Sequence, residues 1–155
     1  MNNERILINK LKSFENINSN LLNILLALFG TLLLAISSKV QVPFWPVPMT
    51  MQTFVIFLIG MTYGVRLSFA TVALYLIEGA AGLPVFASGG GIAYLIGPTA
   101  GYLYGMLFAS VAISYLANLG LSKTYFKATF SLIAGSIIIF SIGIIYLGSI
   151  IGYEK

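Results

Sequence analysis

Residues 79–104 of the chain read GAAGLPVFASGGGIAYLIGPTAGYLY, and this stretch decides the fold. It belongs to a run of 44 residues, 79–122, that carries no charged side chain. Pro84, the run Gly89-Gly90-Gly91 and Pro98 prevent it from forming one membrane-spanning helix. At membrane depth, irregular backbone survives only where protein buries it or where it lines a cavity. The stretch is therefore predicted to form the wall of a pocket.

Composition places the chain in a lipid bilayer. Of its 155 residues, 59% are hydrophobic and only 8% are charged, whereas a soluble domain carries about 25% charged residues. The length allows five or six crossings of about 20 residues each. We predict an all-α membrane protein, a polytopic helical bundle with five transmembrane helices. The loops after the first and third helices are expected to be irregular or re-entrant.

The residue types argue against an enzyme. The chain has no cysteine and no histidine, and its four carboxylates are those of Glu4, Glu15, Glu78 and Glu154. Thiolate chemistry and the commonest general base are therefore excluded. We expect no catalytic residue, no metal site and no cofactor. The net charge of +4 is spread through apolar sequence and makes no face for a nucleic acid.

The chain divides into a polar tail and one membrane domain. Residues 1–20 are predicted to form a cytosolic N-terminal tail, and residues 21–155 a single transmembrane domain. The predicted helices are Leu21–Ser38, Met49–Tyr63, Leu67–Ala81, Pro98–Asn118 and Ala128–Leu147. Pro98 is expected to be the first residue of its helix, where the missing N–H has no cost.

Two features of the first half of the chain leave alternatives open. Ala27, Thr31 and Ala35 recur every four residues, which suits either packing inside the bundle or docking of a partner subunit. Three prolines between residues 39 and 48 favour extended, polyproline-like backbone. Phe44 and Trp45, which lie among them, suit either an aromatic belt at the interface or a stiff lid over a ligand.

Glu78 and the cations bear on topology. Glu78 is the only acid within a predicted span, and it suits either an interfacial position or a ligand or coupling role. With a cytosolic N-terminus, six of the eight cations fall inside, as the positive-inside rule requires. The inside cations are Arg5, Lys10, Lys12, Arg66, Lys123 and Lys127, and the outside ones are Lys39 and Lys155. Both irregular loops then lie outside the plasma membrane.

Three segments resemble one known family. They are VPFWPVPMTMQTFVIFLIG (42–60), LYLIEGAAGLPVFASGGG (74–91) and LIGPTAGYLYG (95–105). In this order and spacing they resemble the BioY family, the substrate-binding S components of energy-coupling factor (ECF) biotin transporters. The resemblance covers about residues 21–155. It implies biotin uptake through a six-helix bundle with both termini in the cytosol and a biotin pocket open to the outside.

The resemblance also implies site residues and partners. Glycines allow backbone N–H groups to approach the ureido ring, and aromatic rings cover the apolar part of biotin. The implied biotin-binding residues are Phe44, Pro46, Phe86, Ser88, Gly89, Gly90, Gly91 and Tyr102. The implied protein partners are a transmembrane coupling protein and two cytosolic ATPase subunits. The family docks through the first helix, which here means Ala27, Thr31 and Ala35.

The sequence departs from the family pattern at two places. Ala100 replaces a glycine in the segment GPTAGY. In the family, the segment resembling GYEK (152–155) leads into a sixth helix whose charged side chains contact biotin, so this chain is expected to lack that helix. Two other functions therefore stay open, which are a receptor for another small vitamin-like solute and a non-functional truncated remnant.

Overall fold

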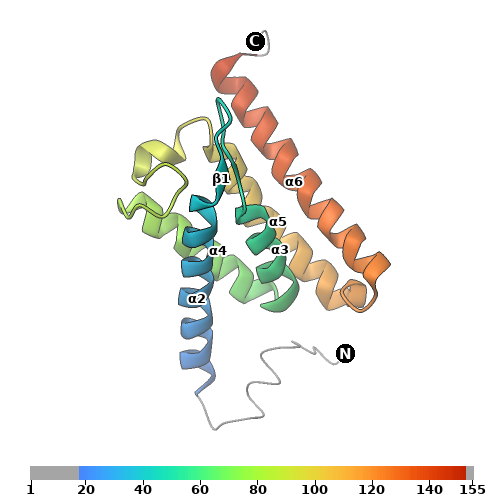
Figure 1. Cartoon of the computed structure of the whole chain (residues 1–155). Coiled ribbons are helices and arrows are strands. Elements are labelled where there is room, and N and C mark those ends of the chain that lie inside the picture. The colour runs from blue at the N-terminus through green and yellow to red at the C-terminus, as the bar shows by residue number, and fades with distance from the viewer. Residues whose placement is uncertain (1–17, 153–155) are drawn as a thin grey trace.

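The computed structural model describes residues 18–152, and it confirms the predicted all-helical bundle (Figure 1). Residues 1–17, nearly all of the predicted cytosolic tail, lie outside the described residues. The helices are α2 (Ser19–Lys39), α3 (Gln52–Thr62), α4 (Val65–Ala80), α5 (Ala100–Leu116) and α6 (Tyr125–Ile151). Shorter elements are β1 (Gln41–Val42), β2 (Met49–Thr50), the 3-10 turn η1 (Ile92–Leu95) and the π-helical turn η2 (Ala117–Leu121).

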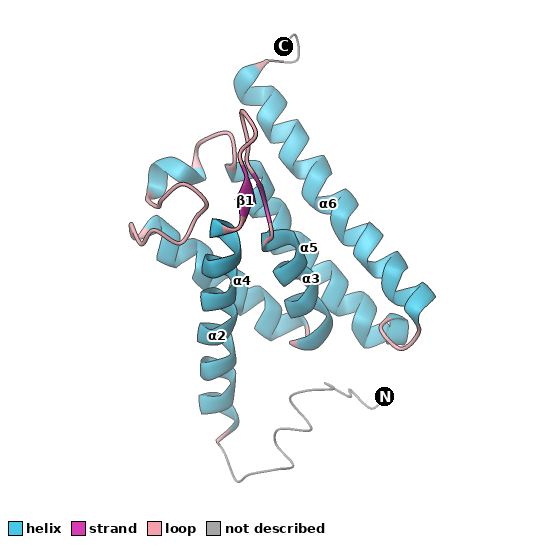
Figure 2. Cartoon of the chain, viewed as in Figure 1, coloured by secondary structure: helices cyan, strands magenta, loops and turns pink. Residues whose placement is uncertain are grey.

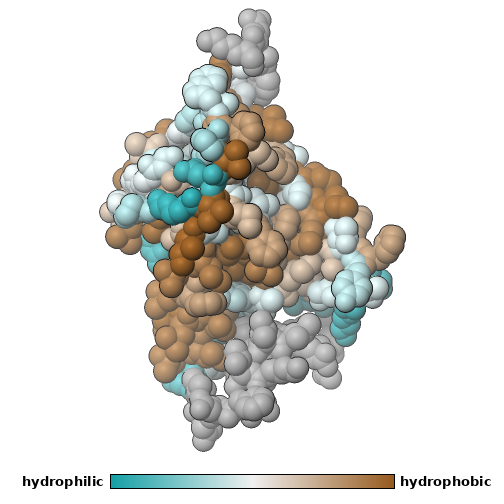
Figure 3. All heavy atoms as spheres, in the orientation of Figure 1, coloured by the Kyte–Doolittle hydropathy of each residue, from teal (hydrophilic) through white to brown (hydrophobic). Residues whose placement is uncertain are grey.

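Three helical segments are long and apolar enough to cross a membrane, namely Ser19–Lys39, Ala100–Leu121 and Tyr125–Ile151. Apolar side chains cover much of the visible surface, and hydrophilic ones are confined to small areas (Figure 3). The chain is therefore a membrane protein. By contrast, α3 has 11 residues and is about 16 Å long at 1.5 Å per residue, roughly half of the hydrocarbon core. The backbone that precedes α3 is not helical.

That backbone is a β-hairpin, which differs from the predicted polyproline-like segment. The strands β1 and β2 pair antiparallel, with Gln41 opposite Thr50 and Val42 opposite Met49 (Figure 2). The three prolines stay in the connection between the strands, where the ladder requires no N–H from them. Because Met49 and Thr50 take part in the ladder, the second helix begins at Gln52 and not at the predicted Met49.

Two later helix boundaries also differ from prediction. Pro98 precedes the fourth helix, which begins at Ala100 with Thr99 as its N-cap residue. The last helix is longer than predicted, because it begins at Tyr125 and continues to Ile151. Gly152 follows with a φ of 86°, a left-handed conformation that is typical of the residue after a helix.

Glycines allow α5 and α6 to lie close together, and the two helices run beside each other over most of their length (Figure 1). A Cβ at Gly105 would lie 2.9 Å from the Ile139 Cα, which means that the backbones nearly touch there. Side chains would likewise overlap at Gly101 with Tyr146, and at Gly143 with Tyr102. Small residues drive helix association in lipid by permitting such approach. This contact fixes α6 as one side of the cavity described next.

A candidate binding site beneath the hairpin

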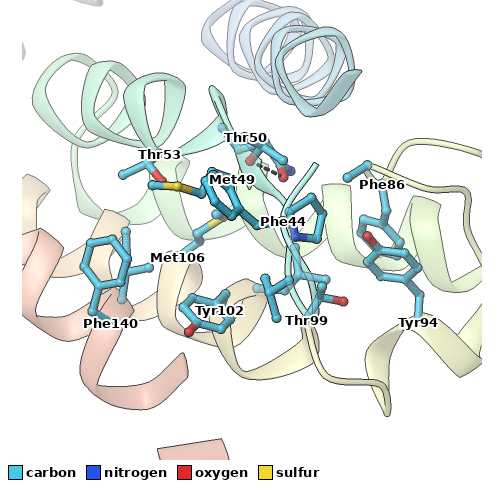
Figure 4. A pocket seen from close by; sticks show the side chains of 16 residues that line it. Phe44, Met49, Thr50, Thr53, Phe86, Tyr94, Thr99, Tyr102, Met106 and Phe140 are labelled. Carbon is cyan, nitrogen blue, oxygen red and sulfur yellow. Dashed lines mark hydrogen bonds between the residues drawn. The ribbon is translucent and has the colours of Figure 1, made fainter. Parts of the chain in front are cut away.

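A cavity of about 350 Å³ lies between the hairpin, the loop 81–99 and the helices α3, α5 and α6. Side chains from all of these elements point into it (Figure 4). Its lining is Phe44, Val47, Pro48, Met49, Thr50, Gln52, Thr53, Phe86, Ala87, Tyr94, Thr99, Tyr102, Leu103, Met106, Ile139 and Phe140. The lining is mainly apolar and aromatic with a few polar groups, and the volume suits a small organic molecule.

Phe86 is the fixed aromatic residue of the cavity wall. Its side chain is fully buried, and its ring stacks on Tyr94 with centroids 4.9 Å apart. Tyr75 meets the same ring edge-on at 5.4 Å. On the side of α4, a Cβ at Gly79 would overlap the Phe86 ring. These contacts hold the ring firmly in the cavity wall.

Three successive carbonyls hold this part of the loop in place. The Ser38 hydroxyl donates to the Val85 carbonyl at 2.8 Å, and the Lys39 ammonium donates to the Phe86 carbonyl at 2.6 Å. The Gln41 amide donates to the Ala87 carbonyl at 3.4 Å. All three donors come from the end of α2 or from β1. The loop is thus fixed to the segment that leads into the hairpin.

A buried chain of polar side chains connects the hairpin with the loop. Thr50 donates its hydroxyl proton to the side-chain oxygen Oε1 of Gln52 at 3.0 Å, and the side-chain amide of Gln52 donates to the Tyr75 hydroxyl at 2.6 Å. Tyr75 in turn donates to the Val85 carbonyl at 2.8 Å. Gln52 and Tyr75 are 4% and 1% exposed, and such fully satisfied networks make a buried site rigid.

Four hydroxyls in the lining are available to a ligand. Within residues 18–152, the side chains of Thr53, Tyr94, Thr99 and Tyr102 make no hydrogen bond to the protein. Their labelled positions in Figure 4 surround the cavity on several sides. Hydroxyls both donate and accept, so this set can satisfy a neutral polar ring or part of a carboxylate.

The structure brings three of the eight candidate site residues to the cavity, namely Phe44, Phe86 and Tyr102. The other five, which are Pro46, Ser88, Gly89, Gly90 and Gly91, are not among its lining residues. The glycines instead shape the loop behind Phe86. Gly89 exchanges two backbone hydrogen bonds with Phe86, and the Gly91 N–H donates to the Gly79 carbonyl at 2.7 Å. A Cβ at Gly90 would overlap the Leu83 carbonyl.

Much of the lining was not identified from the sequence. Thr53, Met106, Ile139 and Phe140 lie in uniformly apolar helices, where no local pattern separates a cavity residue from a packing residue. The position of Gln52 could be predicted from the sequence, because a polar side chain within an apolar helix normally faces the bundle. Tyr94 follows the glycine run, but its role depends on the stacking partner Phe86, which only the fold supplies.

The small-residue face of α2 packs against other helices of the bundle, as one of the two interpretations expected, and docking of a partner on it stays a prediction. Ala27 and Thr31 are 9% and 4% exposed, and Ala35 is half-buried. The Thr31 hydroxyl donates to the half-buried Glu78 carboxylate at 3.3 Å, which ties α2 to α4. The open face of α2 is instead the one that carries Leu28. The hydrogen bond from Thr31 gives Glu78 a partner within the bundle, and Thr31 belongs to the helix face that was also predicted for docking.

The described residues contain no group of three or more His, Cys, Asp or Glu side chains that could hold a metal ion. Lys39 is the one cation near the cavity among residues 18–152, and its ammonium is bound to the Phe86 carbonyl. The lining is therefore suited to the apolar and the neutral polar parts of a solute.

Comparison with known proteins gives a consistent result. The model of the BioY family matches residues 9–154. Two named relatives are the probable biotin transporters BioY of Rickettsia prowazekii and Pyrococcus horikoshii. The first is 33% identical over 96% of this chain and 76% of its own length, and the second is 36% identical over 84% and 76%. The fold matches a solved S-component for biotin from an ECF-type ABC transporter, with a TM-score of 0.76 and 25% identity over 87% of this chain and 76% of the other.

Proposed function

Because the chain belongs to the BioY family, we propose that it is the biotin-binding subunit of an ECF-type transporter. The observation that carries the proposal is the cavity beneath the hairpin. Biotin is an apolar bicycle with a polar ureido edge and a carboxylate on a short chain. The aromatic lining suits the bicycle, and the four unbonded hydroxyls suit the polar edge. We expect binding and release of the solute without chemical change, as for the relatives that are named as transporters.

Phe44, Phe86 and Tyr102 are the proposed biotin contacts among the residues singled out from the sequence. Phe86 and Tyr102 belong to the fixed wall, whereas Phe44 is carried on the hairpin and is 57% exposed. A ligand would cover this open aromatic ring. Burying a large apolar side chain contributes about 1.5–3 kcal/mol, so Phe44 is the residue whose removal is most informative.

The test is a biotin titration of the purified full chain in detergent. Saturable binding is expected for biotin and not for an unrelated vitamin such as thiamine. Phe44→Ala should weaken biotin binding at least tenfold, about 1.4 kcal/mol. The matched control is Trp45→Ala, because Trp45 is the next residue of the hairpin, is 85% exposed and is not a lining residue. Absence of saturable biotin binding, or equal losses in the two variants, would refute the proposal.

We further propose that the cavity opens to the outside of the plasma membrane and that the N-terminus is cytosolic. Among the described residues, Arg66, Lys123 and Lys127 lie at the α3–α4 and α5–α6 turns, opposite the hairpin, and Lys39 lies at the hairpin end (Figure 1). The positive-inside rule then supports an outer hairpin. The chain has no cysteine, so single-cysteine variants report cleanly. An impermeant maleimide should label Ser88→Cys and spare Lys123→Cys in intact cells; the reverse pattern would overturn this orientation.

The proposed partners are a transmembrane coupling protein and two cytosolic ATPase subunits, which would supply the energy for uptake. The exposed apolar side chains of α2, among them Leu25, Leu28 and Leu32, support a helix partner on that side. We propose that this contact includes the exposed face of α2 next to Ala27 and Thr31. Co-purification of the tagged chain with such subunits tests the assembly, independently of biotin binding.

A further inference from the structure

The end of the molecule opposite the cavity carries a second hollow, with a volume of about 450 Å³. It lies where α5 turns into α6 and is lined by Leu119, Gly120, Leu121, Phe126, Lys127 and Phe130. Gly120 lies within the π-helical turn and has a φ of 87°, a non-helical conformation that kinks the chain there. The lining is apolar except for the Lys127 side chain. We refer to this hollow as the turn groove.

The turn groove is exposed to an unusual degree for its composition. Tyr125 and Phe126 are 95% and 89% exposed, and Leu119 and Phe130 are 60% and 61% exposed. From Phe130, the exposed side chains of Ile133 and Ile137 continue along one side of α6 at helical spacing. These residues make a continuous apolar track, which leads from the groove toward the middle of the membrane.

The charge at the groove has one sign. Lys123 and Lys127 are both exposed, and within residues 18–152 neither ammonium has a hydrogen bond or an ion pair. Glu78 is the only carboxylate in the described part of the chain, and it lies near the other end of α4, toward the loop of the cavity. The first turn of α6 adds N–H groups that no side chain caps. An anion is therefore the favoured polar occupant.

We propose that the turn groove binds one anionic phospholipid. The headgroup phosphate lies against Lys123 and Lys127, and an acyl chain lies in the groove and along the track of Phe130, Ile133 and Ile137. Basic pockets between transmembrane helices are suited to such headgroups, and aromatic side chains such as Tyr125 favour the interfacial depth. The inference depends on the chain being a membrane protein and does not depend on biotin.

The test measures lipid binding to the purified full chain in detergent by native mass spectrometry, with phosphatidylglycerol and phosphatidylcholine titrated separately. Wild type should retain one phosphatidylglycerol and bind phosphatidylcholine much more weakly. The double variant Lys123→Gln, Lys127→Gln should bind phosphatidylglycerol about 30-fold more weakly, which is about 2 kcal/mol for two basic residues. Its biotin affinity should not change, because no residue lines both hollows and they meet α6 at different levels, at Phe126 and Phe130 for the groove and at Ile139 and Phe140 for the cavity.

Arg66→Gln is the matched control, because Arg66 is an exposed cation at the same end of the bundle but outside the groove. It should keep the wild-type affinity for phosphatidylglycerol. Equal binding of the two lipids by wild type would overturn the proposal. So would an unchanged affinity in the double variant, or an equal loss in Arg66→Gln. Loss of a co-purifying subunit in a double variant that keeps its phosphatidylglycerol would assign the groove to a protein partner instead.

Discussion

Gly79→Ala is the smallest change that should close the cavity from behind. Gly79 lies in α4 next to the far end of the Phe86 ring, at Cζ and the two Cε atoms, and an added Cβ would overlap that ring. The Phe86 Cε1 atom, the most distant of the three nearest ring atoms, would lie 2.6 Å from the new methyl group. To reach an ordinary contact of 3.4 Å, it has to retreat by 3.4 − 2.6 = 0.8 Å, and the other two ring atoms by more.

The direction of that retreat is set by the neighbours of Phe86. Tyr94 stacks on the ring and Tyr75 meets it edge-on, so we expect a displaced ring to press on the cavity wall that it helps to form. Overpacking of this size costs about 1–3 kcal/mol. If about 1.4 kcal/mol of it opposes the ligand, biotin affinity falls about tenfold. The change adds a good helix former, so the helix itself is not weakened.

The assay compares biotin affinity with thermal stability in Gly79→Ala and in a matched control. Gly60→Ala provides that control, because its Cβ would lie 2.8 Å from the Ile113 Cγ2, in the α3–α5 contact and outside the cavity lining. Both variants should lose thermal stability, and only Gly79→Ala should lose biotin affinity. Equal affinities in the two variants, or a loss confined to Gly60→Ala, would refute the reasoning about Phe86.

Two further predictions concern the supporting contacts. Tyr75→Phe removes the acceptor of the buried Gln52 amide, which should cost about 1–3 kcal/mol of stability and weaken biotin binding. Tyr104→Phe removes a single hydrogen bond to the Leu95 carbonyl and should have a smaller effect on both stability and binding. A larger effect of Tyr104→Phe would contradict the role given to the buried network. Ala27→Leu should lower the melting temperature, because Ala27 is buried in the core. An unchanged melting temperature together with loss of a co-purifying coupling protein would contradict this and favour the docking interpretation.

The fold class and the family could be predicted from the sequence, because both depend on patterns that extend over most of the chain. Apolar segments separated by proline and glycine predict a bundle interrupted by irregular loops, and the structure confirms the bundle. The hairpin was not predicted, because strands of two residues are too short to show an alternating pattern. Its pairing depends on the meeting of Val42 with Met49, which no local signal specifies.

The candidate site was only partly predictable, for a related reason. The glycine run indicated irregular backbone, but it did not indicate what the glycines approach. At Gly90 the close neighbour is the Leu83 carbonyl of the same loop. The hydroxyls of Thr53 and Thr99 become candidate ligand groups only through their place beside the cavity, because each lies in or next to an ordinary apolar helix.

The three carbonyl contacts to α2 and β1 have a mechanical consequence. Donors from Ser38, Lys39 and Gln41 grip three successive residues of the loop that carries Phe86. A loop segment that is hydrogen-bonded at three successive residues follows both the rotation and the displacement of the segment that holds it. If α2 tilts within the bilayer, the wall of the cavity has to turn with it, and the ring of Phe86 shifts relative to α5 and α6. A change in the tilt of α2 would therefore be passed to the cavity wall through these three hydrogen bonds.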